Sequence, residues 1–189
     1  MSNFAIKPFK TVLSSLLLGV IITSSTCIAG QRGLPAQQGI PNFGKVTDTL
    51  YRGSQPDAAA ITNLAKFGVK SIINLRMAKE GWQPEEAIAR AQGIQYTNFP
   101  MHGFGRPTDE QMRAVLSLIH SLPGPVFIHC RYGCDRTGTV IACYRIEHDR
   151  WSKDVAMREA VKYGISRFEF GMKNFVLAFA SAPAPLATK

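Results

Sequence analysis

The stretch His129-Cys130-Arg131-Tyr132-Gly133-Cys134-Asp135-Arg136-Thr137-Gly138 decides how this chain is organised. It follows the apolar run 125–128, which Pro and Gly precede, and such a run predicts a buried strand. The residues 139–146 after it are apolar with a helical period and predict a helix. A loop between such a strand and helix directs backbone N–H groups and a helix N-terminus at one point. We therefore expect an anion site here.

Cys130 and Arg136 carry the expected chemistry of this loop. A thiol at an anion site becomes more acidic, because the amides and the helix dipole favour the thiolate. Arg136 follows Cys130 by six positions and would return over the loop with a planar fork that binds two phosphate oxygens. The pattern predicts a phosphate held above a nucleophilic sulfur. A buried structural cysteine in a loop without phosphate is the alternative interpretation.

The pattern His-Cys-x5-Arg-Thr-Gly at 129–138 resembles the signature loop of the cysteine-dependent protein tyrosine phosphatase superfamily. The short flanking elements resemble its compact dual-specificity members, and the Tyr-Arg-x-x-Gln-Pro stretch at 51–56 is similar to openings in bacterial members. The resemblance covers about 46–179. It implies two-step phosphoryl transfer, in which the Cys130 thiolate attacks phosphorus and water then hydrolyses the phosphocysteine. It implies no cofactor, and no ligand constellation for a metal stands out.

The resemblance also implies roles for the residues around the nucleophile. The phosphate-binding loop would comprise Arg131, Tyr132, Gly133, Cys134, Asp135 and Arg136, with the backbone amides and the Arg136 guanidinium matching the equatorial oxygens. Thr137 would help to expel the sulfur in the second step, and His129 would fix the loop by hydrogen bonding. Arg76, Arg106 and Arg131 are candidate rim cations, and together with Asp135 they suggest inositol phosphates or phosphoinositides as the alternative substrates.

The general acid is the least clearly specified part of the site. Related enzymes place an Asp just beyond a Phe-Pro or Tyr-Pro pair, but no Asp follows the Phe-Pro pair at 99–100 directly. Asp135 is the first candidate because it stands directly before Arg136, as in the Trp-Asp-Arg-Thr loops of myotubularin-like lipid phosphatases. Asp109 is an alternative, with helix N-capping as its competing role. His102 is the third candidate, with a solvated loop histidine as the competing interpretation.

The remaining pattern predicts a single-domain α/β fold. Strands are expected at 49–52, 69–75, 94–99 and 125–128, and helices at 57–67, 84–92, 108–122, 139–146, 152–163 and 166–179. Such alternation predicts a mainly parallel four- to five-stranded sheet with helices on both faces, as in dual-specificity phosphatases. Ligands collect at the carboxyl ends of such strands, where Arg76 and Cys130 would emerge.

Composition and the N-terminus set the expected context. Lys7 and Lys10 precede an apolar run at 12–22, and small residues follow up to 29, which is typical of a secretory signal peptide at 1–29. An uncleaved N-terminal anchor is the alternative. We expect a linker at 30–45, a catalytic domain at 46–181 and a flexible tail at 182–189. The protein would be periplasmic or secreted, monomeric, and not stably inserted in a membrane after cleavage.

The net charge of +9 suits an anionic partner. No cluster of Lys and Arg with interleaved aromatic residues stands out, so nucleic acid is not expected as a partner. Two enzyme functions remain: a phosphatase of phosphotyrosine and related protein phosphoesters, and, as the alternative, a phosphatase of inositol phosphates or phosphoinositides. A rhodanese-like sulfurtransferase usually has a shorter loop. A non-catalytic binding module would be expected to lose Cys130 or Arg136.

Three cysteines remain after removal of Cys27 with the signal peptide: Cys130, Cys134 and Cys143. An odd number without paired spacing does not indicate a disulfide framework. Cys134 lies four positions from Cys130 and would be able to trap it as a reversible disulfide. Packing beneath the loop is the alternative role of Cys134. Cys143 is expected to be a small core residue.

Overall fold

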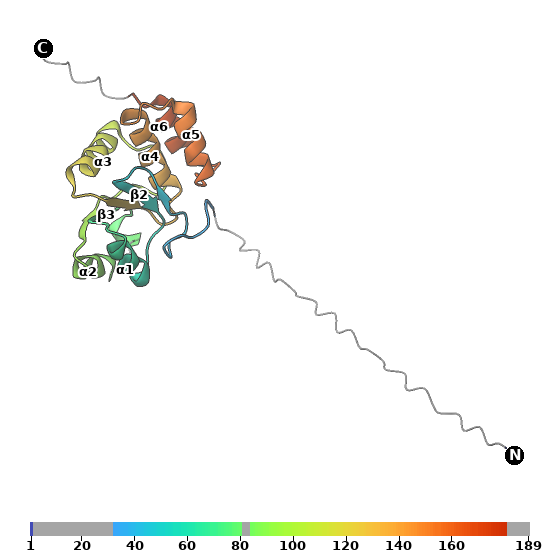
Figure 1. The fold of residues 1–189 in the computed structure, drawn as a ribbon. Helices are drawn as coiled ribbons and strands as arrows, with labels where there is room; N and C mark the ends of the chain where they lie inside the picture. The colour runs from blue at the N-terminus through green and yellow to red at the C-terminus, as the bar shows by residue number, and fades with distance from the viewer. Residues whose placement is uncertain (2–31, 81–83, 181–189) are drawn as a thin grey trace, which may run out of the picture. The chain divides into compact units, whose positions relative to one another are not determined.

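The computed structural model describes residues 1, 32–80 and 84–180 (Figure 1). The predicted signal peptide beyond Met1 and the predicted tail at 182–189 lie outside these residues. Within the described ranges, no helix has the length and hydropathy that a membrane crossing requires.

A five-stranded sheet forms the centre of the domain, in the order β1-β2-β5-β3-β4. Its strands are β1 (Gly44–Lys45), β2 (Leu50–Gly53), β3 (Ser71–Asn74), β4 (Gln95–Asn98) and β5 (Val126–His129). Strands β2, β5, β3 and β4 are parallel, and only the short edge strand β1, which the sequence pattern did not predict, is antiparallel. In the register, Gly53 and Asn74 both lie opposite His129, so three strands end at the same level.

Helices cover both faces of the sheet, as predicted. The helices are α1 (Ala58–Lys66), α2 (Pro84–Ala91), α3 (Asp109–Ser121), α4 (Asp135–Glu147), α5 (Lys153–Lys162) and α6 (Phe170–Ala178), with a 3-10 turn η1 at Ala78–Glu80. Helices α1 and α2 lie on one face, and α3 to α6 lie on the other (Figure 1). Each face has its own core cluster of buried apolar side chains. The predicted α/β class and mainly parallel sheet are therefore confirmed.

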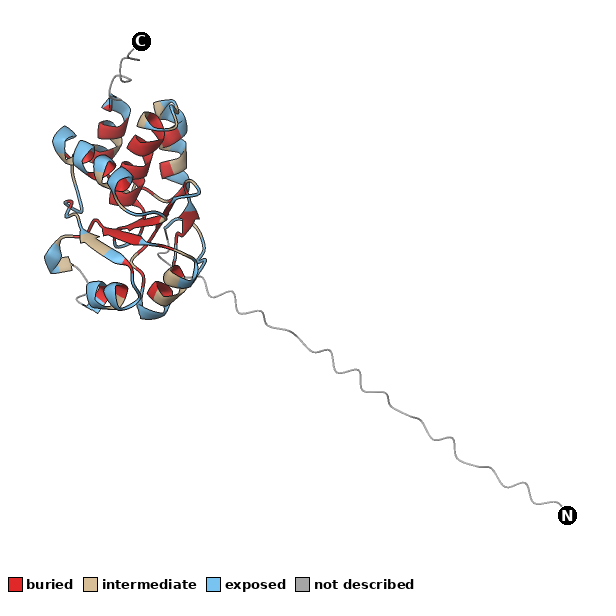
Figure 2. Cartoon of the chain, turned by 60° about the vertical axis from the view of Figure 1, so that its left-hand side comes forward, coloured by how far each residue is buried: buried red, intermediate tan, exposed pale blue. Residues whose placement is uncertain are grey.

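Helix α4 is the most deeply enclosed element, with eleven of its 13 residues buried. It packs against α3, α5 and α6 as well as the sheet, so its surface is covered on nearly all sides. Figure 2 shows this concentration of buried residues in α4 and in the strands beneath it. The helix begins at Asp135, earlier than the apolar period from 139 indicated. Arg136 and Thr137 consequently belong to its first turn.

Two sequence expectations differ from the structure. The last helix was expected from 166, but α6 begins only at Phe170 with Glu169 as its N-cap, and Phe168 before it is 60% exposed. The stretch 30–45 was expected to be a linker, yet Ile40 and Asn42 are fully buried. The stretch has no hydrophobic period, because its buried side chains come from a largely irregular backbone and not from one face of a helix or strand. The folded domain thus includes residues before 46.

Candidate active site

The end of β5 and the start of α4 position the predicted nucleophile. Cys130 directly follows β5 and is only 3% exposed, below the N-terminus of α4. Gly133 allows the intervening loop to turn, because its φ of +67° lies in the left-handed region. A Cβ at this position would also come within 2.5 Å of the Gly53 carbonyl carbon and oxygen. Glycine is therefore required twice, for the backbone angle and for the close approach of the loop to β2.

Arg136 is 6% exposed, and the first turn of α4 carries it. Its Nη1 donates hydrogen bonds to Glu80 Oε2 at 2.9 Å and to the Met101 carbonyl oxygen at 3.2 Å. Gly103 lies beside the same guanidinium, since a Cβ there would be 3.8 Å from Arg136 Cζ. Sequence reasoning missed Glu80. The available signal was its position shortly after Arg76, at the edge of the sheet where the site was expected.

Thr137 is fully buried in the same turn. Its hydroxyl oxygen has no hydrogen-bond partner among the residues that the structure describes. A buried hydroxyl without a partner is costly unless it meets a ligand or a reacting group. The arrangement is compatible with the predicted role of Thr137 next to the sulfur.

His129 is joined to a second carboxylate that the sequence analysis missed. Its Nε2 lies 2.7 Å from Glu85 Oε1, and both side chains are fully buried. Burial alone would raise the pKa of Glu85, but the charge and hydrogen bond of His129 outweigh it, so the pKa lies below its ordinary value. Asn74 Nδ2 also donates to Glu85, and the Tyr96 hydroxyl donates to the same oxygen. This pair anchors the start of α2 behind the nucleophile.

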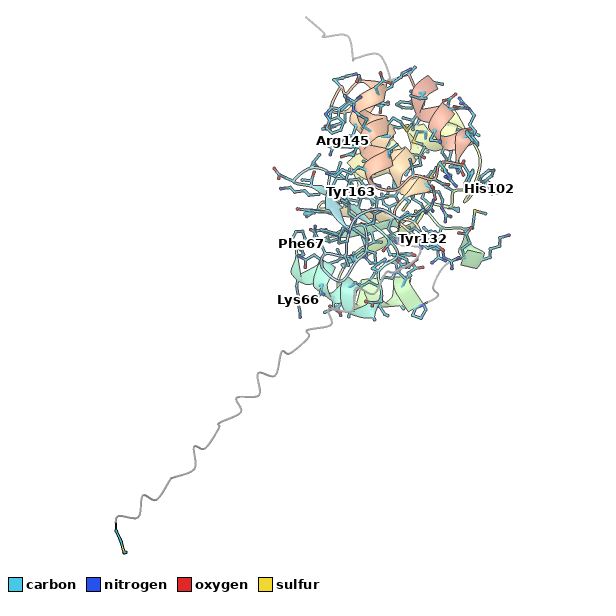
Figure 3. The ribbon with its side chains drawn as sticks, turned by 90° about the vertical axis from the view of Figure 1, so that its right-hand side faces the viewer. Lys66, Phe67, His102, Tyr132, Arg145 and Tyr163 are labelled. Carbon is cyan, nitrogen blue, oxygen red and sulfur yellow. The ribbon has the colours of Figure 1, made fainter. Side chains whose placement is uncertain are left out.

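The predicted rim cations differ in exposure. Arg76 is 8% exposed and donates to Gln55 Oε1 at 2.7 Å, and burial lowers its pKa. Arg131 is exposed, and its guanidinium lies over the ring of Tyr132, which is labelled in Figure 3. Arg106 is exposed and lies over the Phe175 ring. Of these three residues, Arg76 is the one enclosed near the ends of the strands.

Among the described residues, Arg136 donates its hydrogen bonds to Glu80 and Met101 and to none of the three predicted proton donors. Asp135 accepts hydrogen bonds from Arg32 Nη2 at 2.6 Å and from the Ser166 amide at 2.7 Å. Asp109 is exposed in the first turn of α3, where Thr108 and not Asp109 is the N-cap. His102 is exposed in the loop after β4. Among the described residues, Glu80 is the carboxylate that contacts Arg136.

The cysteines other than Cys130 are enclosed. Cys134 is fully buried, with its Sγ 3.2 Å from the Tyr132 carbonyl oxygen, and burial raises its pKa to about 12. Cys143 lies in the core of α4, and burial raises its pKa as well. All three described cysteines are free. The surroundings of Cys134 favour packing over redox chemistry, because a protonated thiol is a poor nucleophile.

Comparison with known proteins identifies the family. Residues 35–176 match the family model described as a DSP-PTPase phosphatase fused to NAD+ kinase. The chain is 28% identical over 158 residues to the dual specificity protein phosphatase TpbA of Pseudomonas aeruginosa, covering 81% of this chain and 69% of TpbA. It is 32% identical over 147 residues to the putative tyrosine-protein phosphatase OCA1 of Mycosarcoma maydis, covering 72% of this chain and 85% of OCA1.

Solved structures show the same fold. The crystal structure of P. aeruginosa TpbA superimposes with a TM-score of 0.67 at 24% identity, covering 80% of this chain and 92% of that one. The catalytic core of the PP-IP phosphatase SIW14 from S. cerevisiae gives a TM-score of 0.66 at 25% identity, covering 74% and 85%. The chain therefore belongs to the compact, dual-specificity-like members of the cysteine-dependent protein tyrosine phosphatases.

Proposed function

We propose that this protein is an exported phosphatase that hydrolyses phosphomonoesters through a phosphocysteine at Cys130. Phosphotyrosine and related protein phosphoesters are its first proposed substrates. The observation that carries the proposal is the buried Cys130 at the end of β5, with Arg136 in the first turn of the helix that follows. Proposed export depends on the pattern at 1–29, which precedes the folded domain.

In the first step, the Cys130 thiolate attacks phosphorus, and the bond from phosphorus to the leaving oxygen breaks. Arg136 and the loop amides donate hydrogen bonds to the three equatorial oxygens of the phosphoryl group as charge redistributes, which stabilises the transition state. In the second step, water attacks the phosphocysteine, and the sulfur leaves as a thiolate. The buried Thr137 hydroxyl would then donate a hydrogen bond to the departing sulfur.

An ester leaving group needs a proton in the first step. Asp135 was the first candidate from the sequence, but Arg32 and Ser166 engage its carboxylate oxygens. We therefore add Glu80 as a candidate, because its partly exposed side chain lies beside Arg136. Glu80 would donate a proton only in its protonated form, after the phosphate replaces it as the partner of Arg136. A carboxyl group at this place would lie beside the bound phosphate.

Hydrolysis of inositol phosphates, in particular a diphosphate group on such a ring, is the second candidate function. Gly103 favours it, because this glycine lies beside Arg136 in the loop where related enzymes carry an Asp. A diphosphate releases a weakly basic phosphate group, which departs without a proton donor more readily than an alkoxide. The chain is 27% identical over 144 residues to an Arabidopsis thaliana protein named inositol diphosphatase DSP4.

The deciding experiment compares kcat/KM of the purified protein for phosphotyrosine peptides, soluble inositol monophosphate esters and inositol diphosphates. The first proposal predicts the highest value for phosphotyrosine peptides. Preference for the diphosphates would replace it with the second. Absence of hydrolysis of all three and of a small aryl phosphate would contradict both.

A further inference from the structure

The signature loop is held from behind through three consecutive carbonyl groups, those of residues 131–133. The Gln55 amide donates to the first at 3.3 Å. The side-chain amide of Asn42 lies 3.2 and 3.1 Å from the second and third carbonyl oxygens. Arg52 Nη2 donates to the third at 2.7 Å. These donors come from β2, the residues after it and the segment before β1, so they approach the loop from one side.

This arrangement determines the direction of the loop's N–H groups. In a trans peptide, the carbonyl and the following N–H point to opposite sides, and the loop contains no cis bond. The Gln55 amide holds the carbonyl of residue 131, so the Tyr132 amide turns toward the other side. Asn42 and Arg52 hold the next two carbonyls, which turns the amides of Gly133 and Cys134 the same way. No described residue accepts a hydrogen bond from these three amides. Successive free amides in a concave loop form an anion site.

Arg52 adds a charge directly behind the loop. Its side chain is fully buried, and its guanidinium lies 3.8 Å from the centre of the Tyr163 ring. Within the described ranges, its Nε and Nη1 have no hydrogen-bond partner, and no carboxylate forms an ion pair with it. Burial lowers the pKa of Arg52 to about 10, so it remains charged at neutral pH. A buried cation without an ion pair is costly, and an anion in front of the loop would offset that cost.

Asn42 is placed for this task by its own backbone and contacts. It is fully buried with a φ of +59°, a left-handed conformation that asparagine tolerates better than most residues. Its Oδ1 accepts from the Leu34 amide at 2.8 Å, which orients the side chain so that Nδ2 faces the loop. The same Nδ2 donates to the Tyr163 carbonyl oxygen at 2.9 Å. The segment before β1 therefore contributes directly to the shape of the loop.

We propose that Asn42 and Arg52 are positioning residues that align the amides of Gly133 and Cys134 for a phosphate-like oxyanion. The proposal rests on the proposed function of this loop as a phosphate site. It goes further in assigning the alignment to two residues outside the loop. The competing role is packing alone, in which these residues stabilise the fold without affecting the anion.

The test measures tungstate affinity and melting temperature of the folded protein for Asn42→Ala, Arg52→Met and Arg52→Lys. Loss of one neutral donor should weaken tungstate binding about fivefold to tenfold in Asn42→Ala, and loss of the charged donor about tenfold or more in Arg52→Met. Arg52→Lys retains a charged donor and should recover part of the affinity. The KM for an aryl phosphate should rise in parallel. Asn63→Ala and Arg90→Met are matched controls, because both residues lie away from the loop.

If Asn42→Ala does not fold, the Arg52 variants still test the positioning proposal. Replacement of a buried unpaired charge by Met is expected to leave the melting temperature unchanged or higher, while tungstate affinity falls. Wild-type affinity in folded Arg52→Met would overturn the proposal. The proposal would also be overturned if Arg52→Met and Arg52→Lys lost the same tungstate affinity and this loss paralleled the fall in their melting temperatures. Packing would then be the role of Arg52. Failure of the wild-type protein to bind tungstate would instead contradict the proposed function.

Discussion

The signature loop and the loop after β4 both contact Arg136, but the fold holds them in contrasting ways. The signature loop is enclosed at its base, where Cys130 and Thr137 are buried and Gly133 packs directly against β2, while Arg131 and Tyr132 are exposed. In the loop after β4, His102 and Phe104 are exposed, and Phe104 is 72% exposed. The proposed phosphate binding and nucleophilic attack would thus depend on a tightly packed part of the molecule. In the proposed function, the loop after β4 would contribute to substrate selection, whereas the candidate proton donor Glu80 lies in η1, after β3.

This contrast would allow one site to accept several phosphoesters. In the proposed function, the signature loop recognises the phosphoryl group, which all the candidate substrates share. The loop after β4 would meet the leaving group, and there the chain departs from the pattern of an Asp after the Phe-Pro pair at 99–100. Replacement of Cys130 or Arg136 should therefore abolish or severely reduce activity on every substrate, whereas changes in the loop after β4 should alter the order of preference.

The largest effect is expected from Cys130→Ser. Hydrolysis should fall below detection for all substrates, because a serine hydroxyl at this position lacks an activating base. Tungstate binding should persist, since Arg136 and the loop amides remain. Kinetic assays on an aryl phosphate, paired with tungstate titration, check both parts. Substantial hydrolysis by Cys130→Ser at equal purity would mean that another residue is the nucleophile.

Arg136→Lys should be almost as severe, with kcat lowered about a hundredfold to a thousandfold. A lysine keeps the charge but loses the planar fork that binds two oxygens. The loss should be similar for aryl and alkyl phosphates, because the fork acts on the phosphoryl group. Arg131→Lys is the matched control in the same loop, where the exposed side chain should tolerate the change. A loss in Arg136→Lys that depends strongly on the leaving group would contradict this division of roles.

The general acid should give a selective effect. If Glu80 donates the proton, Glu80→Gln should slow hydrolysis of alkyl phosphates by about a hundredfold and of activated aryl phosphates much less. Asp135→Asn, Asp109→Asn and His102→Gln tested in the same series are expected to lack this dependence. Leaving-group dependence in Asp135→Asn alone would restore the assignment made from the sequence. Its absence from all four variants would support the diphosphate as substrate, because no proton donor is then needed.

The smallest effect concerns stability behind the enclosed loop. Folding lowers the pKa of Glu85, so its contribution is present above the ordinary glutamate pKa of about 4.3 and is lost as the pH falls below it. Glu85→Gln should lower the free energy of unfolding at pH 7 by about 1–3 kcal/mol and flatten its decline in acid. Denaturant titrations between neutral and acidic pH measure both. Glu86→Gln is the exposed control. An unchanged acid profile in Glu85→Gln would remove the proposed importance of the His129 pair.

Sequence patterns predicted what is local in the chain. The signature loop was recognisable because its functional residues are contiguous, and the strands and helices followed from their hydrophobic periods. Asn42, Glu80 and Glu85 were not found, because their contacts join positions far apart in the sequence, such as Asn42 and Gly133. In segments without a hydrophobic period, the sequence does not indicate which part of the fold a polar side chain will contact. Asp135 stood in the right place along the chain, but Arg32, more than a hundred positions earlier, engages its carboxylate.

The central claim is a covalent phosphocysteine at Cys130, and rapid acid quenching during turnover tests it most directly. Mass spectrometry of the digested protein should find the peptide with Cys130 heavier by one phosphoryl group, and the modification should be absent without substrate. The same peptide should remain unmodified in Cys130→Ser, while Cys134→Ser should still be phosphorylated at Cys130. Phosphorylation of a different residue during turnover, or steady hydrolysis with no modified peptide under conditions that trap a reference cysteine phosphatase, would contradict the account.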